Sequence, residues 1–458
     1  MTEHENICDA PPKPSSRVSQ NPVDLRFFAI CFLALLFYIP LGMIDGITDS
    51  RIDNLRYAVK DVSGVWGNGE KIAAPIISVP VRITVEENID NHPFEGYDKK
   101  TVVHTKTYAF LPDELNIETE LVPEMRHKGI YNILVYAARL HISGNFGKFD
   151  LPFVKKGNST YEILWNEAYL NIGVNAAQIR GKTEILFNGH DLSPVPGTRL
   201  EQIEGISAPL DLEAAPGESR FSISLQLNGR ETISFAPLGK KNSFEVVSPW
   251  PDPYFRSTFR PQSSEISENG FKAKWEIPYL ARNYPQVFEN GNKRVLSGIQ
   301  EKTVEVGLYE AAPLYRNVQR LSDYGIMFVA LTFIMMFLFE RGLKQNLYYV
   351  QYAVIGLSLC LFFLTLLSLS EHICFGISYV IASLVVIFMI SLYLYGALKN
   401  KTAAAFAAFI LAVIYGVLYL MFSESDYALL IGTGTLLTTM GLVMWQTRGL
   451  NAHPEDDE

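Results

Sequence analysis

The chain has 458 residues, of which 48% are hydrophobic, and a formal net charge of −9 at pH 7. Phosphate backbones repel an acidic chain, so this charge argues against nucleic acid as a partner. The apolar residues are concentrated in long uncharged runs, which is typical of a protein that crosses a membrane.

The N-terminal region predicts a disordered segment followed by a membrane anchor. Residues 9–21 are rich in Pro and Ser, so we expect 1–26 to be a disordered cytoplasmic segment. Residues 27–44 form a run of 18 uncharged residues between Arg26 and Asp45. No small-x-small cleavage site follows and Pro40 lies inside the run, which favours an uncleaved transmembrane anchor over a signal peptide.

The segment 45–323 is long enough, at 279 positions, to be a folded region inserted between the anchor and the later apolar runs. An amphipathic helix is predicted at its start, ending near Gly64, because apolar residues recur three and four positions apart at Ile52, Leu55, Val59, Val62 and Trp66. This helix is either a stalk that packs on the following domain or a helix that lies on the membrane or pairs with another chain.

The rest of 45–323 predicts β structure, arranged as one or two antiparallel sandwich domains. Apolar and polar residues alternate from Leu115 to Leu121 and again from Phe221 to Asn228. The second run leads through Gly229 to a strand at 232–235, which predicts a β-hairpin. Further strands are expected at 76–85, 101–111, 130–142, 161–172, 244–247, 271–277 and 304–309.

Residues 324–447 carry only eight charged side chains in 124 positions, all in the gaps between apolar runs. The runs span 324–339, 345–370, 373–398, 402–422 and 427–447 and have 16, 26, 26, 21 and 21 residues. A helix needs about 20 residues to cross the hydrocarbon core. We therefore predict six transmembrane α-helices, one N-terminal and five C-terminal, with a large, mainly antiparallel β domain between the first and the second.

The flanking charges predict the orientation, because Lys and Arg are retained on the cytoplasmic side. Alternate segments hold eight Lys and Arg residues if the N-terminus is inside, and the two short outside loops hold none. The eight are Lys13, Arg17, Arg26, Arg341, Lys344, Lys399, Lys401 and Arg448. Both termini, including the tail 448–458, are expected to be cytoplasmic, with 45–323 on the opposite side.

Two clusters are candidate sites. Glu371 and His372 lie in one outside loop and Asp426 in the other, so they could form an acid/base pair or bind a metal; the other interpretation is a polar cap that docks the β domain. The segment 250–255, Trp-Pro-Asp-Pro-Tyr-Phe, is either a rigid connection pinned by Trp250 or a surface whose aromatic residues bind a sugar or lipid headgroup. Its candidate ligand-binding residues are Trp250, Tyr254 and Phe255.

Motifs of known enzyme classes are missing from the sequence, which has no HExxH, GxxxxGK[ST], GxSxG or CxxC. We expect neither a cofactor nor a bound metal. None of the four cysteines lies in 45–323, so no disulfide framework stabilises that region. The predicted spans hold no Asp, Glu, Lys, Arg or His, which disfavours a proton-coupled transporter. The four threonines between 433 and 439 are expected to support helix packing rather than a polar path.

Several stretches resemble the CreD family of inner-membrane proteins of Gram-negative bacteria. They include 129–131, 250–255, Leu331-Thr332-Phe333, Val350-Gln351-Tyr352, 368–372, 426–430 and Thr447-Arg448. The chain departs from the family pattern at Tyr348-Tyr349, where His-Pro is common, and at Arg256-Ser257, where a Gly is usual. The resemblance implies a multi-pass protein of the inner membrane with a periplasmic domain, controlled by a two-component system and linked to envelope stress, colicin tolerance and the β-lactam response.

The family has no agreed reaction, so three functions stay open. The first is a non-enzymatic protein that supports cell envelope integrity by binding another envelope protein, a lipid or a glycan through its periplasmic domain, while the helices lie in the lipid bilayer. The second is a membrane enzyme that acts on a lipid or glycan through Glu371, His372 and Asp426. The third is a channel or exporter. The missing catalytic motifs favour the first.

Overall fold

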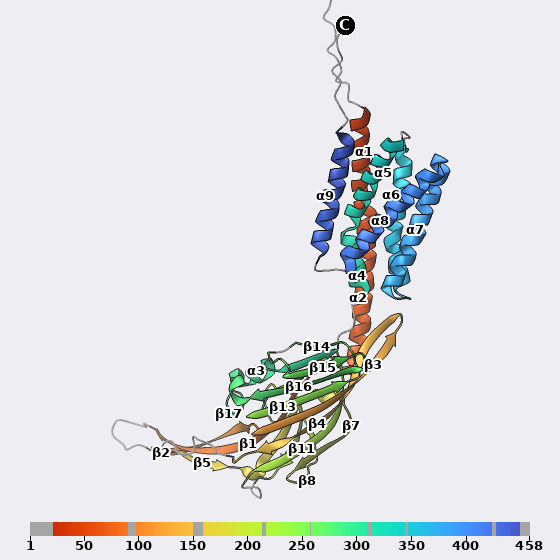
Figure 1. Ribbon diagram of the computed structural model, residues 1–458. Coiled ribbons are helices and arrows are strands. Elements are labelled where there is room, and N and C mark those ends of the chain that lie inside the picture. The colour runs from red at the N-terminus through yellow and green to blue at the C-terminus, as the bar shows by residue number, and fades with distance from the viewer. Residues whose placement is uncertain are drawn as a thin grey trace, which may run out of the picture. The chain divides into compact units, whose positions relative to one another are not determined.

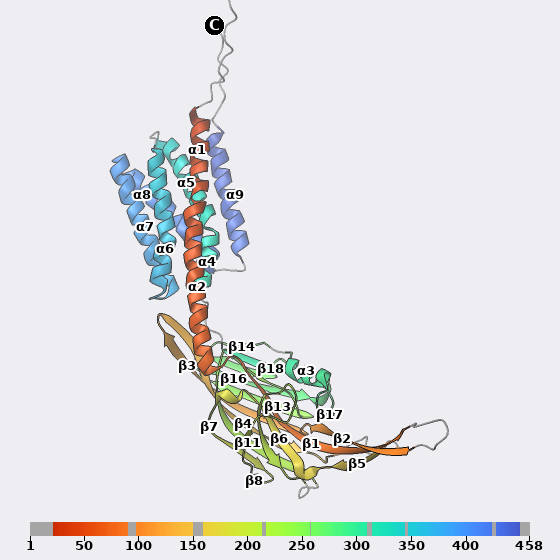
Figure 2. The ribbon, with the colours of Figure 1, turned by 180° about the vertical axis from the view of Figure 1, so that it is seen from behind.

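The computed structural model describes residues 22–89, 98–149, 159–212, 217–256, 258–308, 314–343, 347–423 and 427–448. The chain forms two compact units, Met1–Asp53 with Ala312–Glu458 and Asn54–Ala311 (Figures 1 and 2). The second unit is therefore inserted in the sequence of the first, as predicted for a membrane protein with an inserted β domain.

The inserted unit is built mainly from two β-sheets. In the described residues one sheet has ten strands: β1 (Glu70–Ile89), β2 (Asp98–Phe110), β5 (Ser159–Ile163), β6 (Ala168–Gly173), β9 (Val195–Pro196), β10 (Gly205–Leu210), β12 (Thr232–Phe235), β14 (Pro253–Phe255), β17 (Val287–Glu289) and β18 (Val304–Leu308). The other has eight, in the order β15-β16-β13-β3-β4-β11-β7-β8. Their bounds are β3 (Glu114–Lys128), β4 (Tyr131–Phe146), β7 (Ile179–Phe187), β8 (His190–Asp191), β11 (Ser219–Arg230), β13 (Lys241–Ser248), β15 (Ser263–Ser267) and β16 (Gly270–Pro278).

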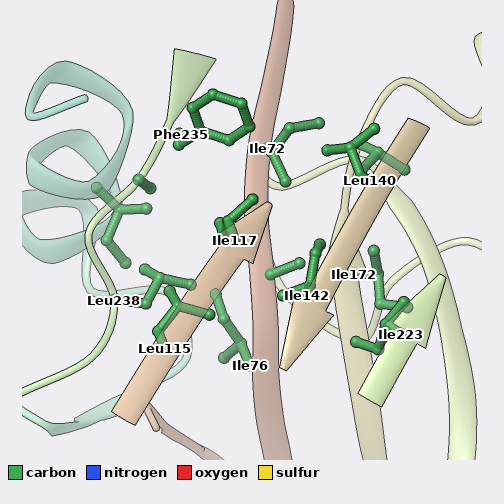
Figure 3. Packing of buried hydrophobic residues seen from close by; sticks show 14 of the residues in the cluster. Ile72, Ile76, Leu115, Ile117, Leu140, Ile142, Ile172, Ile223, Phe235 and Leu238 are labelled. Carbon is green, nitrogen blue, oxygen red and sulfur yellow. The ribbon is translucent and has the colours of Figure 1, made fainter. Parts of the chain in front are cut away.

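The two sheets share one apolar core, which makes the unit a β-sandwich. Ile72 and Ile76 of β1 pack with Leu115 and Ile117 of β3 and with Ile142 of β4 (Figure 3). The predicted alternation along β3 is confirmed, because Leu115, Ile117, Thr119 and Leu121 are buried while Asn116, Glu118 and Glu120 are exposed. The strand pairs are antiparallel except β1 with β12 and β3 with β13. The helix α3 (Lys293–Glu301), the 3₁₀ turns η1 (Trp165–Glu167), η2 (Ala176–Gln178) and η3 (Tyr279–Ala281), and the C-terminal part of a long helix that ends at Trp66 complete the described part of the unit.

The predicted hairpin through Gly229 is wrong. Strand β11 pairs with β4 and β7 in the eight-stranded sheet, whereas β12 pairs with β1 and β18 in the other sheet. The chain changes sheets at Glu231, which has a positive φ of 60°. Gly229 provides space rather than a turn, since a Cβ there would lie 2.3 Å from Oη of Tyr136.

The strand expected at 161–172 is divided in two. Strands β5 and β6 both pair with β1, but η1 interrupts them where the chain passes Pro80 of β1. Pro80 has no N–H to donate to a ladder, although its carbonyl accepts from the Leu164 N–H at 3.0 Å.

The predicted anchor and amphipathic helix form one long helical segment. Helix α1 (Pro22–Leu36) and helix α2 (Tyr38–Trp66) are separated by a single residue, Phe37. Pro40 explains the interruption, because it lacks the N–H that would bind the carbonyl of Leu36 four residues earlier. Helix α2 ends two residues beyond the predicted Gly64.

The far end of α2 packs on the sandwich, which confirms the stalk interpretation. Ala58 is buried against Ile133 and Val135 of β4, and Val62 and Trp66 add to this cluster. The helical stripe in the sequence is therefore an intramolecular contact surface.

The other unit contains α4 (Leu314–Asp323), α5 (Gly325–Leu343), α6 (Tyr349–Ser370), α7 (Phe375–Leu398), α8 (Lys401–Ser423) and α9 (Ala428–Thr447) beside α1 and the start of α2. Four described helices, including the N-terminal segment Arg26–Trp66, are long and apolar enough to cross a membrane, and a fifth is added if α4 and α5, bent by 47°, count as one span. The apolar part of α9, Leu429–Trp445, is shorter. The structure thus has an N-terminal apolar helix, a large β region and three to five C-terminal candidate spans.

Candidate functional site

Glu371, the first predicted site residue, binds two other helices of its own unit. Its Oε1 accepts a hydrogen bond from Oη of Tyr315 on α4 at 3.1 Å and lies 3.5 Å from Nε of Arg51 on α2. The Glu371 side chain is only 9% exposed. This carboxylate therefore links the end of α6 to α2 and α4.

The predicted grouping of Glu371 with His372 and Asp426 stays a prediction. His372 is exposed and its peptide N–H donates to the carbonyl of Leu369, while Asp426 lies outside the described residues. Among the described residues, no group of three or more His, Cys, Asp or Glu side chains is placed to hold a metal ion. The contacts of Glu371 are those of a helix-linking residue.

The aromatic residues of 250–255 pack mainly inward. The Phe255 ring lies 5.5 Å from the ring of Trp275 in an edge-to-face arrangement, and Trp250 packs against the core. The Tyr254 ring covers Gly307 of β18, where a Cβ would lie 2.1 Å from the ring. Burial, together with the carboxylates of Glu231 and Glu305, raises the pKa of Tyr254. These contacts support the interpretation of a rigid, pinned connection.

Sequence reasoning missed a buried ion pair in the helical unit. Glu340, on α5, is 4% exposed, and Nη2 of Arg26 on α1 lies 2.9 Å from its Oε1. Tyr352 donates to the other carboxylate oxygen at 3.0 Å, and the Leu347 N–H also donates to Glu340. The sequence contains a signal for this pair, because Arg26 and Glu340 have opposite charges and each lies at the end of an apolar run on the same predicted membrane face.

Glu70 is a second buried carboxyl, at the start of β1. It is 1% exposed; Asn175 donates to its Oε1 at 3.5 Å, and its Oε2 has no hydrogen-bond partner among the described residues. Burial raises the pKa of Glu70 to about 7, and the hydrogen bond from Asn175 opposes this rise only in part.

The outer face of the eight-stranded sheet carries a groove of about 640 Å³, within the range of ligand sites. Its lining comes from five neighbouring strands: Glu118, Thr119 and Glu120 of β3, Arg139, Leu140 and His141 of β4, Lys182 and Glu184 of β7, Ser224, Leu225 and Gln226 of β11, and Glu245 and Val247 of β13. We call this surface the sheet groove. The sequence pattern does not distinguish this surface, because outward polar residues alternate with buried apolar residues along any strand that is buried on one face.

Strand register sets the order of side chains in the sheet groove. Glu245 lies opposite Glu118, which lies opposite His141, which lies opposite Ser224. Nδ1 of His141 is 3.2 Å from Oγ of Ser224. A second row holds Glu120 and Arg139, which form an exposed ion pair of 2.9 Å.

The threonines of α9 make local contacts. The hydroxyls of Thr435, Thr438 and Thr439 each donate at 2.8 Å to the carbonyl four residues earlier in the same helix. Such bonds satisfy a hydroxyl in an apolar environment within one helix, so the role of these threonines in packing between helices stays a prediction.

Comparison with known proteins identifies the family. A family model described as inner membrane protein CreD matches residues 22–453. The inner membrane protein CreD of Escherichia coli strain K12 is 30% identical over 440 residues, which cover 94% of each chain.

Solved structures give only weak likenesses. An M1 zinc metallopeptidase mutant of Deinococcus radiodurans, solved with a Tyr-Ser-Ala substrate, has 8% identity and a TM-score of 0.19 and covers 47% of this chain and 54% of its own. Native yeast LTA4 hydrolase has 9% identity and a TM-score of 0.19, and the match covers 49% of this chain and 35% of the hydrolase. The family match and the Escherichia coli relative both span nearly the whole chain, so the chain belongs to the CreD family of inner membrane proteins.

Proposed function

We propose that this multi-pass inner-membrane protein supports cell envelope integrity without catalysis, by binding an envelope component through the sheet groove. The helical unit anchors the chain, and the sandwich presents the groove in the periplasm. The observation that carries the proposal is the groove itself, a hollow of about 640 Å³ lined with hydrogen-bonding side chains.

The orientation rests on the distribution of Lys and Arg. All eight such residues in the short segments next to the spans fall on one side if six helices cross, and the positive-inside rule makes that side cytoplasmic. The sandwich then lies in the periplasm and both termini in the cytoplasm.

A non-enzymatic role is supported by the contacts of Glu371. Its carboxylate is held by Arg51 and Tyr315, so it is engaged in joining helices. The exposed His372 has no described carboxylate within ion-pairing distance. A general acid or base needs a positioned partner and access to a substrate.

Complementation tests this function. In cells that lack the native copy and show an envelope-stress defect, Ser224→Trp should fail to restore resistance, because the indole fills the sheet groove at a strand position that tolerates it. Arg82→Trp, at an exposed position of the other sheet, is the matched control and should restore it. His372→Ala should also restore it. Full rescue by Ser224→Trp at normal protein level would refute binding through the groove.

A further inference from the structure

We infer that the sheet groove binds an uncharged carbohydrate chain laid across the strands. This inference rests on the proposed function and adds the chemical class of the partner.

Most of the side chains that line the groove can form hydrogen bonds, and few of them are apolar. Among its described lining residues, Leu140 and Leu225 point into the core, so Val247 is the one apolar side chain that reaches the surface. Protein partners dock mainly through buried aromatic and aliphatic anchors, and an acyl chain needs an apolar channel. The lining favours a ligand that presents hydroxyl and amide groups.

The charges of the groove are nearly balanced by neighbouring ion pairs. Arg139 pairs with Glu120 at 2.9 Å, Lys182 pairs with Glu184 at 3.2 Å, and Lys272 of β16 pairs with Glu245 at 2.7 Å. A phosphate-rich polymer needs an excess of Lys and Arg, which these pairs do not leave. The charge balance therefore favours an uncharged ligand.

One carboxylate remains without an ion-pair or hydrogen-bond partner among the described residues. Glu118 lies between Glu245 on β13 and His141 on β4, and like charges directly opposite one another destabilise a sheet. Lys272 attracts both carboxylates but forms its hydrogen bond with Glu245. Hydroxyl donors from a ligand would satisfy Glu118 and reduce its repulsion of Glu245. A carboxylate that accepts from sugar hydroxyls forms charge-assisted hydrogen bonds, which are the stronger kind.

Polar side chains repeat at a regular interval across the strands of the groove. The row Glu245, Glu118, His141, Ser224 places one polar side chain on each successive strand, and adjacent strands lie about 4.8 Å apart. That interval is close to the length of one hexose ring in a linear chain. An oligosaccharide laid across the strands would therefore meet one polar side chain per ring.

Binding measurements with the full-length protein in detergent test the inference. The probes are three uncharged tetrasaccharides, chitotetraose, cellotetraose and maltotetraose, and the readout is saturation-transfer NMR with calorimetric titration. At least one probe should bind, and Glu118→Ala combined with Arg139→Ala should weaken it at least tenfold. Arg82→Ala combined with Glu162→Ala removes an exposed ion pair from the other sheet and should leave the affinity unchanged.

The outcomes separate the inference from the function on which it rests. If none of the three saccharides binds while Ser224→Trp still abolishes rescue, the carbohydrate inference is wrong and the binding function stands. If a saccharide binds equally to wild type and the Glu118/Arg139 double variant, it does not occupy the groove and the inference fails. If Ser224→Trp also rescues fully, both fail.

Discussion

Glu340 shows how a single charged residue is retained within an apolar bundle. Three donors from Arg26, Leu347 and Tyr352 surround its carboxylate. Each donor comes from a different position along the chain, so the pair fixes the N-terminal helix against the end of α5 and the start of α6. A buried ion pair with these hydrogen bonds specifies geometry more than it adds stability.

Removing one partner of this pair should be costly. Glu340→Ala removes the acceptor of the Leu347 N–H and of the Tyr352 hydroxyl and leaves Arg26 with the Leu347 carbonyl alone, so we expect a loss of about 1–3 kcal/mol in the free energy of unfolding. Denaturant titration of the protein in mild detergent measures it. Glu162→Ala, which breaks the exposed pair with Arg82, should cost under about 1 kcal/mol. Equal losses of unfolding free energy in the two variants would show that the contacts of Glu340 stabilise the protein no more than an exposed ion pair does.

Glu70 makes stability depend on pH. Its folded pKa of about 7 lies above the ordinary value of 4.5, so the folded state favours the protonated carboxyl. The contribution of protonated Glu70 to the free energy of unfolding is fully present below pH 4.5 and is lost as the pH rises to about 7.

Glu70→Gln should therefore stabilise the protein at pH 8 by about 1–2 kcal/mol and change little at pH 5. Thermal unfolding at the two pH values, with Glu162→Gln as an exposed control, measures the difference. A variant that is less stable than wild type at pH 8 would contradict the assigned protonation.

The residues that the sequence misplaced are those whose environment depends on distant parts of the chain. Glu340 stands beside Arg341 in the gap between two apolar runs, and nothing in the local sequence shows that Arg26 reaches it. Glycine is common in turns, so Gly229 suggested one. Only its contact with Tyr136 of another strand shows that its missing side chain leaves room for the tyrosine ring. Glu371 was located at a helix end correctly, but its partners could not be deduced.

At the scale of elements, local patterns predicted helices and strands better than their pairing. The alternation of apolar and polar residues predicted β3 and β11. The apolar residues three and four positions apart from Ile52 to Trp66 predicted the part of α2 that packs on the sandwich. The change of sheet at Glu231 and the break opposite Pro80 depend on which strands become neighbours. No pattern within one strand contains that information.

The stalk contact can be tested on α2. Ala58→Asp places a carboxylate against Ile133 and Val135, and we expect it to destabilise this contact by about 2–4 kcal/mol. Lys60→Asp changes an exposed position of the same helix and is the matched control. Hydrogen exchange in α2 and β4 should rise in the first variant alone. Unchanged exchange in Ala58→Asp would show that the helix does not need this contact.

At the scale of the whole molecule, the proposed topology makes a direct prediction. A fluorescent protein fused after Glu458 should fold in the cytoplasm, and alkaline phosphatase inserted at Gly189, a turn between β7 and β8, should be active in the periplasm. Six crossings with a cytoplasmic N-terminus require both results. An active phosphatase fused after Glu458 would contradict this topology.

The central claim is that the periplasmic sandwich binds an envelope component through the sheet groove. The most direct measurement is photo-crosslinking in intact cells from benzoylphenylalanine placed at Gln226, an exposed position in the groove, with Arg82 of the other sheet as the control position. We predict that Gln226 yields a discrete adduct that Arg82 does not, and that Glu118→Ala with Arg139→Ala reduces its amount. Equal labelling from both positions, or an adduct that is indifferent to these substitutions, would contradict the account.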